Sequence, residues 1–289
     1  APRPPCGSKQ MDTQLVMEQF LKYEEMLNER TIAVLGRFFP PGVEPLSPVT
    51  GKYMLVNRPS CIVGAIAVYL VVVSLGLLRH KLGSASQKPM STVFKSLTII
   101  HNLFLVLLST HMFTGVLYQA WKNGYSIWGN AYSPSETEMA EVIFTFFWSK
   151  IYEFLDTMIM LYKGNVKQVS FLHVYHHATI SFIWWMIAYN APGGDAYFSA
   201  AQNSFVHIVM YAYYLVAALI GKDEKMKKKY LWWGKHLTQM QMAQFFFNFV
   251  QGIYCGLYSP YPKHLSWLLV YYMCTLLFLF GHFYLSKHG

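Results

Sequence analysis

Charged residues are scarce in this 289-residue chain, because Asp, Glu, Lys and Arg make up only 13% of it. A soluble globular domain carries about 25%. Hydrophobic residues make up 54% and aromatic residues 17%, which predicts a membrane protein. The net charge is +9, but no soluble basic domain stands apart from the apolar segments, so we do not expect nucleic acid as a partner.

Cysteines are also few. Cys6, Cys61, Cys255 and Cys274 form no C-x-x-C pair and show no spacing typical of a metal site. This pattern predicts neither a zinc site nor a disulfide framework, although one isolated bridge stays open. The chain begins at Ala1 with no methionine and no signal-peptide pattern, so we expect a processed or trimmed form.

Seven apolar stretches are long enough to cross a bilayer, whose hydrocarbon core of about 30 Å needs roughly 20 helical residues. They cover residues 61–78, 96–119, 139–161, 169–190, 196–220, 231–257 and 265–285. We therefore expect an all-α, polytopic membrane protein, with a seven-helix domain over residues 61–289 and an N-terminal segment over residues 1–60. Within that segment, residues 11–38 predict either an amphipathic helix on the membrane surface or a helix packed on the bundle.

Lysine and arginine alternate between the predicted loops, and the positive-inside rule counts these residues in short loops. The second, fourth and sixth loops hold only Lys122 and Lys263. The first, third and fifth loops hold the basic positions 79, 81, 88, 95, 163, 167, 222, 225, 227, 228, 229 and 235. We therefore expect the odd loops and the C-terminus in the cytosol, and the N-terminus on the other side of the membrane.

The third span carries charge, and ionisable residues inside a span mark a functional site by default because they are costly. "SKIYEFLDT" places Lys150, Glu153, Asp156 and Thr157 at offsets of three, six and seven, which lie along one helical face. A self-neutralised cluster that only joins helices is the alternative.

The fourth span contains "HVYHH", in which His173, His176 and His177 share one face. Imidazole titrates near neutrality and can act as nucleophile, base or acid. A single histidine on an apolar face is usually a satisfied core residue, but three within five residues favour chemistry.

The fifth and sixth spans carry polar stripes at helical spacing, namely Asn203, His207, Tyr211, Tyr214, Thr238, Gln241 and Gln244. Hydrogen bonding between helices explains either stripe taken alone. With a rise of 1.5 Å per residue, however, the polar stripes of four spans fall in the cytosolic half of the bundle. Their common depth predicts a buried reaction chamber that opens to the cytosol.

Two other classes of protein stay open. H-x-x-H-H also occurs in di-iron membrane oxygenases such as fatty acid desaturases, but these need several histidine boxes and the pattern occurs once here. No H-E-x-x-H zinc signature is present. A seven-helix lipid-binding receptor or carrier would share the span count, but the receptor signatures D-R-Y and N-P-x-x-Y are missing from the expected helix ends.

Four motifs, taken together and in this order, resemble the ELO family of very-long-chain fatty acid elongases: "KIYEFLDT", "HVYHH", "NSFVHIVMYAYY" and "TQMQMAQF". The similarity covers about residues 45–287. Gln168, before the histidine box, and Tyr175, inside it, resemble the subfamily that acts on polyunsaturated chains. "NAPGGDAYFSAA" and "YLWWGKHLTQMQMAQFFFN" are similar to algal and moss elongases of the Δ6 type, which act on C18 polyunsaturated chains.

This resemblance implies a condensing enzyme of the endoplasmic reticulum membrane, a 3-oxoacyl-CoA synthase that joins a long-chain acyl-CoA to malonyl-CoA. It implies no metal or redox cofactor. Implied partners are membrane lipid and the ketoacyl-CoA reductase, dehydratase and enoyl reductase of the elongation cycle, and a homodimer stays open. The loop lysines are expected to attract the CoA phosphates, although membrane topology and anionic lipid explain them equally well.

By the same resemblance, His176 is the nucleophile that takes the acyl group as an acyl-imidazole. We expect His207 and Asn203 to orient malonyl-CoA, and His173 and His177 to position His176. Glu153 and Asp156 are expected to hold the box imidazoles, with Lys150 balancing their charge. The further supporting or substrate-binding positions are Tyr211, Tyr214, Thr238, Gln241, Gln244 and Gln168.

Exposing an acyl chain to water costs about 0.8 kcal/mol per methylene, so we expect an enclosed tunnel that runs from the chamber toward the lumenal side. Residues such as Trp184, Trp185, Phe246 and Phe249 are expected to line it.

Overall fold

The computed structural model describes residues 7–38, 46–83 and 91–288, and the regular structure of this part of the chain is helical. The all-α prediction is thus confirmed for these residues. The larger helices are α1 (Gly7–Phe38), α3 (Pro59–Lys81), α4 (Thr92–Lys122), α5 (Thr137–Tyr152), α6 (Phe154–Tyr162), α7 (Phe171–Asn190), α8 (Ala196–Ile220), α10 (Gly234–Tyr258) and α11 (Lys263–His288). The short helices are η1 (Thr50–Lys52), α2 (Met54–Asn57), η2 (Val166–Gln168) and α9 (Glu224–Tyr230).

Four of the described helices are long and apolar enough to cross a membrane, namely α3, α4, α8 and residues Lys263–Leu285 of α11. They coincide with the first, second, fifth and seventh predicted spans. The third predicted span is two shorter helices, because the α-helical pattern is interrupted at Glu153 between α5 and α6. Helices α7 and α10 have 20 and 25 residues, but histidine, glutamine and asparagine dilute their apolar sequence.

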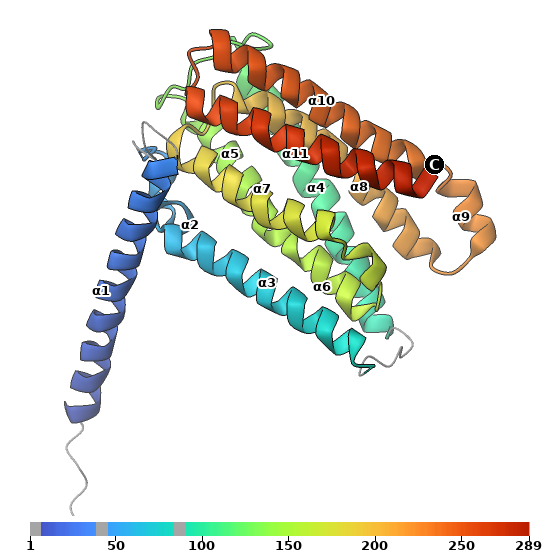
Figure 1. Cartoon of the computed structure of the whole chain (residues 1–289), viewed down its shortest axis with the longest axis horizontal. Helices are drawn as coiled ribbons and strands as arrows, with labels where there is room; N and C mark the ends of the chain where they lie inside the picture. Colours follow the sequence, from blue (N-terminus) through green and yellow to red (C-terminus); the bar gives the residue numbers. More distant parts are fainter. Residues whose placement is uncertain (1–6, 39–45, 84–90, 289) are drawn as a thin grey trace, which may run out of the picture.

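Six helices form a closed ring in which α4 packs on α5, α5 on α7, α7 on α11, α11 on α10, α10 on α8 and α8 on α4. Helix α3 lies outside this ring against α6 and α7. Figure 1 shows the long helices running side by side, with α1 extending away from the bundle at one end.

Helix α1 is fastened to the bundle near its C-terminal end. The Arg58 guanidinium lies 2.8 Å from Glu24, and the Asn28 side chain accepts a hydrogen bond from the backbone of Ser60 at 2.8 Å. Ile32 and Leu35 pack against the main core. The preceding turns expose large apolar side chains, including Leu15, Val16, Phe20 and Leu21. This end of α1 packs on the bundle, and a membrane-surface position for the remainder stays a prediction.

The residues just before α3 also pack into the bundle. The backbone N–H of Ser47 donates to the Tyr189 carbonyl at 2.6 Å, and the Thr50 hydroxyl donates to the Ala188 carbonyl. The Trp185 indole donates to the carbonyl of Val56, whose side chain is fully buried. This strap, residues 47–57, covers the end of α7.

The same end of the bundle is closed around one buried carboxylate. Asp195, only 2% exposed, accepts hydrogen bonds from the backbone N–H groups of Gly129 and Asn130 at 2.9 Å each. It also accepts from the Ser259 hydroxyl and, at 3.1 Å, from the Cys255 thiol. Because these donors come from the loop after α4 and from the end of α10, Asp195 ties three parts of the chain together.

Backbone conformation at this end requires glycine at position 194. Its φ is +50°, and a Cβ atom would lie 2.8 Å from the backbone nitrogen of Tyr132. The Gly194 N–H donates to the Tyr125 hydroxyl, which itself donates to Glu136, and burial raises the pKa of this phenol. The described cysteines, Cys61, Cys255 and Cys274, are free thiols, whereas Cys6 lies outside the described residues.

Candidate active site

The break between α5 and α6 lies at the centre of a buried, charged cluster. The Lys150 ammonium donates to Glu153 at 2.8 Å and to the Asn203 side-chain oxygen at 2.9 Å. The same carboxylate oxygen of Glu153 lies 3.2 Å from Nδ1 of His207. Lys150 and Glu153 are 1% and 2% exposed, so each charge depends on its partners in the absence of water.

One turn further along, Asp156 joins α6 to α4 and α8. Its two carboxylate oxygens accept hydrogen bonds from His101 at 2.7 Å and from the Tyr211 hydroxyl at 2.6 Å. Tyr214 lies edge-on to Tyr211, with ring centroids 6.0 Å apart. His101 is not among the predicted site residues, although a histidine inside a predicted span is itself a signal of function.

The three histidines of the box have different surroundings. His173 Nε2 lies 2.8 Å from the Thr157 hydroxyl, which is in turn 3.1 Å from the hydroxyl of Tyr69. His177 is 7% exposed, and its Nδ1 has no hydrogen-bond partner in the described residues. His176 Nδ1 lies 3.0 Å from the hydroxyl of Tyr272 on α11.

The carboxylates therefore do not hold the box imidazoles, and this expectation is wrong. Hydroxyl groups hold His173 and His176, whereas Asp156 bonds to His101 and Tyr211. Successive helical residues point roughly 100° apart. Thr157 consequently reaches α7 while its neighbour Asp156 reaches α4 and α8.

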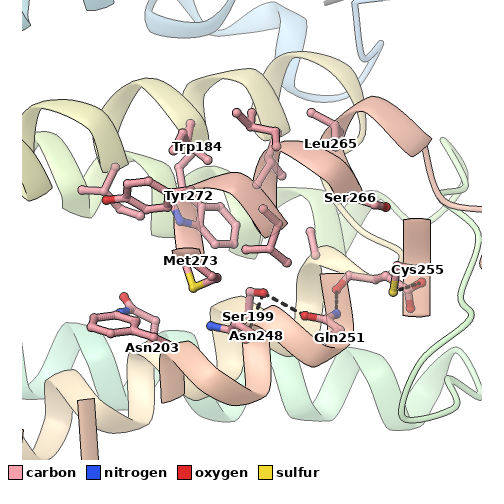
Figure 2. Close-up of a pocket in the computed structure, with 18 of the residues that line it drawn as sticks. Trp184, Ser199, Asn203, Asn248, Gln251, Cys255, Leu265, Ser266, Tyr272 and Met273 are labelled. Carbon is pink, nitrogen blue, oxygen red and sulfur yellow. Dashed lines mark hydrogen bonds between the residues drawn. The ribbon is translucent and has the colours of Figure 1, made fainter. Parts of the chain in front are cut away.

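A long cavity runs between α7 and α11 on one side and α8 and α10 on the other, and its empty space of about 720 Å³ includes openings to solvent. His176, Asn203 and Gln244 line one end, and Asp195 and Cys255 line the other. In Figure 2, Trp184, Met273 and Leu265 lie on one wall, opposite a polar wall of Ser199, Asn203, Asn248 and Gln251.

The predicted α10 stripe reaches this cavity only through Gln244, which is 7% exposed and whose side-chain oxygen has no hydrogen-bond partner in the described residues. Gln241 makes a 3.7 Å contact with the sulfur of Met210, and Thr238 is half-buried. Gln168 lies in η2 and is exposed. The structure thus does not bring Thr238, Gln241 and Gln168 to the cavity.

Of the four aromatic residues expected along an acyl tunnel, only Trp184 lines the cavity. Trp185 is fully buried on the opposite side of α7, where it bonds to Val56. Phe246 is 54% exposed, and Phe249 packs against the core without lining the cavity. Helix rotation separates these neighbours, because adjacent positions face different directions.

The part of the chain that holds this site matches a known protein family. Residues 54–289 match the model of the GNS1/SUR4 family, ELO. The chain belongs to the ELO family. "Fatty acid elongase 6" of Leishmania major is 41% identical over 238 residues, which cover 78% of this chain and 59% of that protein. "Very long chain fatty acid elongase 5" is 34% identical in Rattus norvegicus and 31% in Tachysurus fulvidraco, where the matches cover 83% and 91% of this chain and 78% and 86% of those proteins.

The ELO match contains both the charged cluster and the cavity, and it begins at the first residue of α2, after the end of α1. Two residues of the ELO region that bond directly to predicted site residues, His101 and Tyr272, were not predicted from the sequence. Neither was the polar wall of Ser199, Asn248 and Gln251. In the described part of the ELO region, no group of three or more His, Cys, Asp or Glu side chains is arranged to hold a metal ion.

Proposed function

We propose that this ELO-family chain is the condensing enzyme of fatty acid elongation. It joins a long-chain acyl-CoA to malonyl-CoA and releases a 3-oxoacyl-CoA two carbons longer, carbon dioxide and CoA. A polyunsaturated C18 chain is the proposed acyl group. The observation that carries the proposal is the cavity that has His176 and Asn203 at one end and an apolar wall along its length. The names of the relatives support the same activity.

His176 is the proposed nucleophile among the three box histidines. It lines the cavity, and because Tyr272 contacts its Nδ1, Nε2 is the nitrogen left to react. His173 has its Nε2 engaged by Thr157, and neither His173 nor His177 lines the cavity. Nε2 of His176 attacks the thioester carbon, so that an N–C bond forms, the C–S bond breaks and CoA leaves.

The charged cluster is proposed to serve malonyl-CoA. Decarboxylation leaves an enolate, which is stabilised by hydrogen-bond donors fixed where its charge develops. Lys150 holds the side-chain oxygen of Asn203, and this leaves the amide NH₂ as a donor at the cavity. Glu153 lies 3.2 Å from Nδ1 of His207 and, through Lys150, links this ring to Asn203, although His207 does not line the cavity itself. The enolate carbon then attacks the acyl carbon, and His176 is released.

The acyl chain is proposed to lie in the cavity with its end toward Asp195, in a bundle that crosses the membrane seven times. The His176 end and the C-terminus then face the cytosol and the N-terminus the lumen of the endoplasmic reticulum. The exposed lysines in and beside α9 are better placed to contact the CoA phosphates than Lys163 is. They are Lys222, Lys225, Lys228 and Lys229. Lys163 is half-buried, and burial lowers its pKa.

The test uses the purified full chain in lipid nanodiscs, an acyl-CoA and isotope-labelled malonyl-CoA. We expect the labelled 3-oxoacyl-CoA without added metal and, when malonyl-CoA is omitted, an acyl adduct in the intact mass. His176→Ala should abolish both, whereas His111→Ala, an exposed histidine of α4, should retain them. Condensation at the normal rate by His176→Ala would exclude this nucleophile. Absence of condensation by the unaltered chain, together with stoichiometric iron, would favour the di-iron alternative.

A further inference from the structure

Tyr272 connects α11, which carries none of the four motifs, to the histidine box. Its side chain is buried, and its hydroxyl lies 3.0 Å from Nδ1 of His176 and 3.2 Å from the hydroxyl of Thr179 on α7. The Thr179 hydroxyl also lies 2.6 Å from the carbonyl oxygen of Tyr175. These contacts form one chain of groups from the imidazole to a backbone carbonyl.

Counting protons along this chain gives the direction of each hydrogen bond. Each hydroxyl has one proton to donate and lone pairs to accept, and a carbonyl can only accept. The Thr179 hydroxyl shares its proton between the Tyr175 carbonyl at 2.6 Å and the Tyr272 oxygen at 3.2 Å. The Tyr272 hydroxyl donates to the backbone carbonyl of His176 at 3.5 Å. A proton between Tyr272 and His176 must then come from Nδ1.

The reverse arrangement leaves one contact without a proton. If Tyr272 donated to Nδ1 instead, the 3.5 Å contact between the Tyr272 hydroxyl and the His176 carbonyl would have no proton. The imidazole proton would then be on Nε2, the nitrogen that lacks another partner in this network. Only the Nδ1–H tautomer satisfies every contact in the chain and leaves an unshared electron pair on Nε2.

We infer that Tyr272 and Thr179 are positioning residues that hold the imidazole proton of His176 on Nδ1 and so keep Nε2 available as the nucleophile. This inference rests on the proposed role of His176. Tyr272 accepts the Nδ1–H bond throughout the reaction. When Nε2 forms its bond to the acyl carbon and the C–S bond breaks, the imidazole gains one positive charge and CoA leaves as a thiolate, which takes a proton from water.

No proton has to move at Nδ1 during the second half of the reaction. Malonyl-CoA loses carbon dioxide, and the electron pair of the broken C–C bond forms the new bond to the acyl carbon. The N–C bond breaks, its electrons return to Nε2, and neutral His176 is restored with its proton still on Nδ1. The hydroxyl chain therefore has to select one tautomer and keep it, without relaying a proton.

The test measures CoA release in a single turnover of acyl-CoA without malonyl-CoA, in nanodiscs containing the full chain. A neutral hydrogen bond contributes about 1 kcal/mol, so Tyr272→Phe should slow acylation by about fivefold, since 1.4 kcal/mol is a tenfold change. The KM for malonyl-CoA should not change. Tyr271→Phe makes the same change one residue earlier, on an exposed side chain, and should acylate at the normal rate.

Thr179→Val tests the same contacts from the other side. It removes a donor to the Tyr272 oxygen but leaves Tyr272 its contact with the His176 carbonyl, so acylation should slow by less than in Tyr272→Phe. The double variant Thr179→Val/Tyr272→Phe should be no slower than Tyr272→Phe, because Thr179 acts only through Tyr272. A purely structural role predicts a slower double variant, because two packing defects in contact would accumulate.

The outcomes separate this inference from the proposed function. If the unaltered chain forms no acyl adduct, the proposed role of His176 fails. If the unaltered chain is acylated on His176 while Tyr272→Phe reacts at the normal rate, or while the double variant is slower than both single variants, only the positioning role is overturned. Thermal unfolding of each variant in the same nanodiscs shows whether a slow rate reflects loss of the fold.

Discussion

The buried ion pair between Lys150 and Glu153 gives a quantitative prediction about stability. The two charges lie 2.8 Å apart and are almost fully buried. Removing one partner from such a pair costs about 3–5 kcal/mol, because the other charge stays buried without compensation. Lys150→Met removes the cation and also leaves the side-chain oxygen of Asn203 without its donor. We expect this variant near the upper end of that range.

The expected shift in melting temperature follows from the size of the protein. A change of 1 kcal/mol moves the midpoint by about 2–4 °C in domains somewhat smaller than this chain, so Lys150→Met should unfold about 10 °C earlier. The assay is thermal unfolding of the purified protein in one detergent, followed by tryptophan fluorescence. Lys122→Met is the matched control, because Lys122 and Glu138 form an exposed pair at 3.3 Å. Exposed pairs contribute little, so its midpoint should barely move.

The double variant decides whether the reasoning about charge is right. Lys150→Met/Glu153→Gln removes both buried charges, and replacing a buried pair by neutral groups is often close to neutral for stability. It should therefore unfold at a higher temperature than Lys150→Met alone. A double variant that melts below both single variants, with the two losses adding, would refute the argument and show that packing, rather than charge, sets the cost.

Two further predictions concern the cavity. Asp195 accepts hydrogen bonds from several N–H and O–H donors, whereas the amide of Asp195→Asn can accept at only one oxygen. The midpoint of thermal unfolding should therefore fall by several degrees. An unchanged midpoint would contradict the structural role of this carboxylate. Leu265→Phe adds volume near the end of the cavity away from His176, so the longest acyl-CoA that the protein accepts should become shorter. Gas chromatography of the products measures this change. Leu257→Phe, on an exposed part of α10, should leave the product profile unchanged, and equal profiles for both variants would place the acyl chain elsewhere.

Sequence patterns were sufficient to predict which polar residues of each span share a helical face. Spacing along a helix places residues on a common face, and the charged cluster uses Lys150, Glu153, Asn203 and His207 as the stripes predicted. The limits of α8 agree with the predicted fifth span at both ends. Low charge and long apolar runs likewise predicted the all-helical membrane architecture that the described residues show in part.

Pairings between helices were not predictable in this way. His101 and Asp156 are 55 residues apart, and His176 and Tyr272 are 96 residues apart. Helical periodicity says which residues share a face but not which helix that face meets. The break at Glu153 was also missed, because no glycine or proline lies beside it. The interruption accompanies contacts with Lys150 and His207, which depend on the tertiary fold.

The carboxylates and the Tyr272 hydroxyl contact different histidines, and this division suits the proposed role of His176 as a nucleophile. A carboxylate beside an imidazole favours the protonated, charged ring. This stabilises the imidazolium that a general base forms, but a ring that is already charged has no electron pair to attack an acyl group. Here the carboxylates contact His207 and His101, and the group that contacts His176 is the neutral hydroxyl of Tyr272. A phenol can hold one nitrogen without charging the ring. The structure can therefore hold the proposed neutral nucleophile near the charged cluster that is proposed to stabilise an enolate, because the two sets of partners come from different helices.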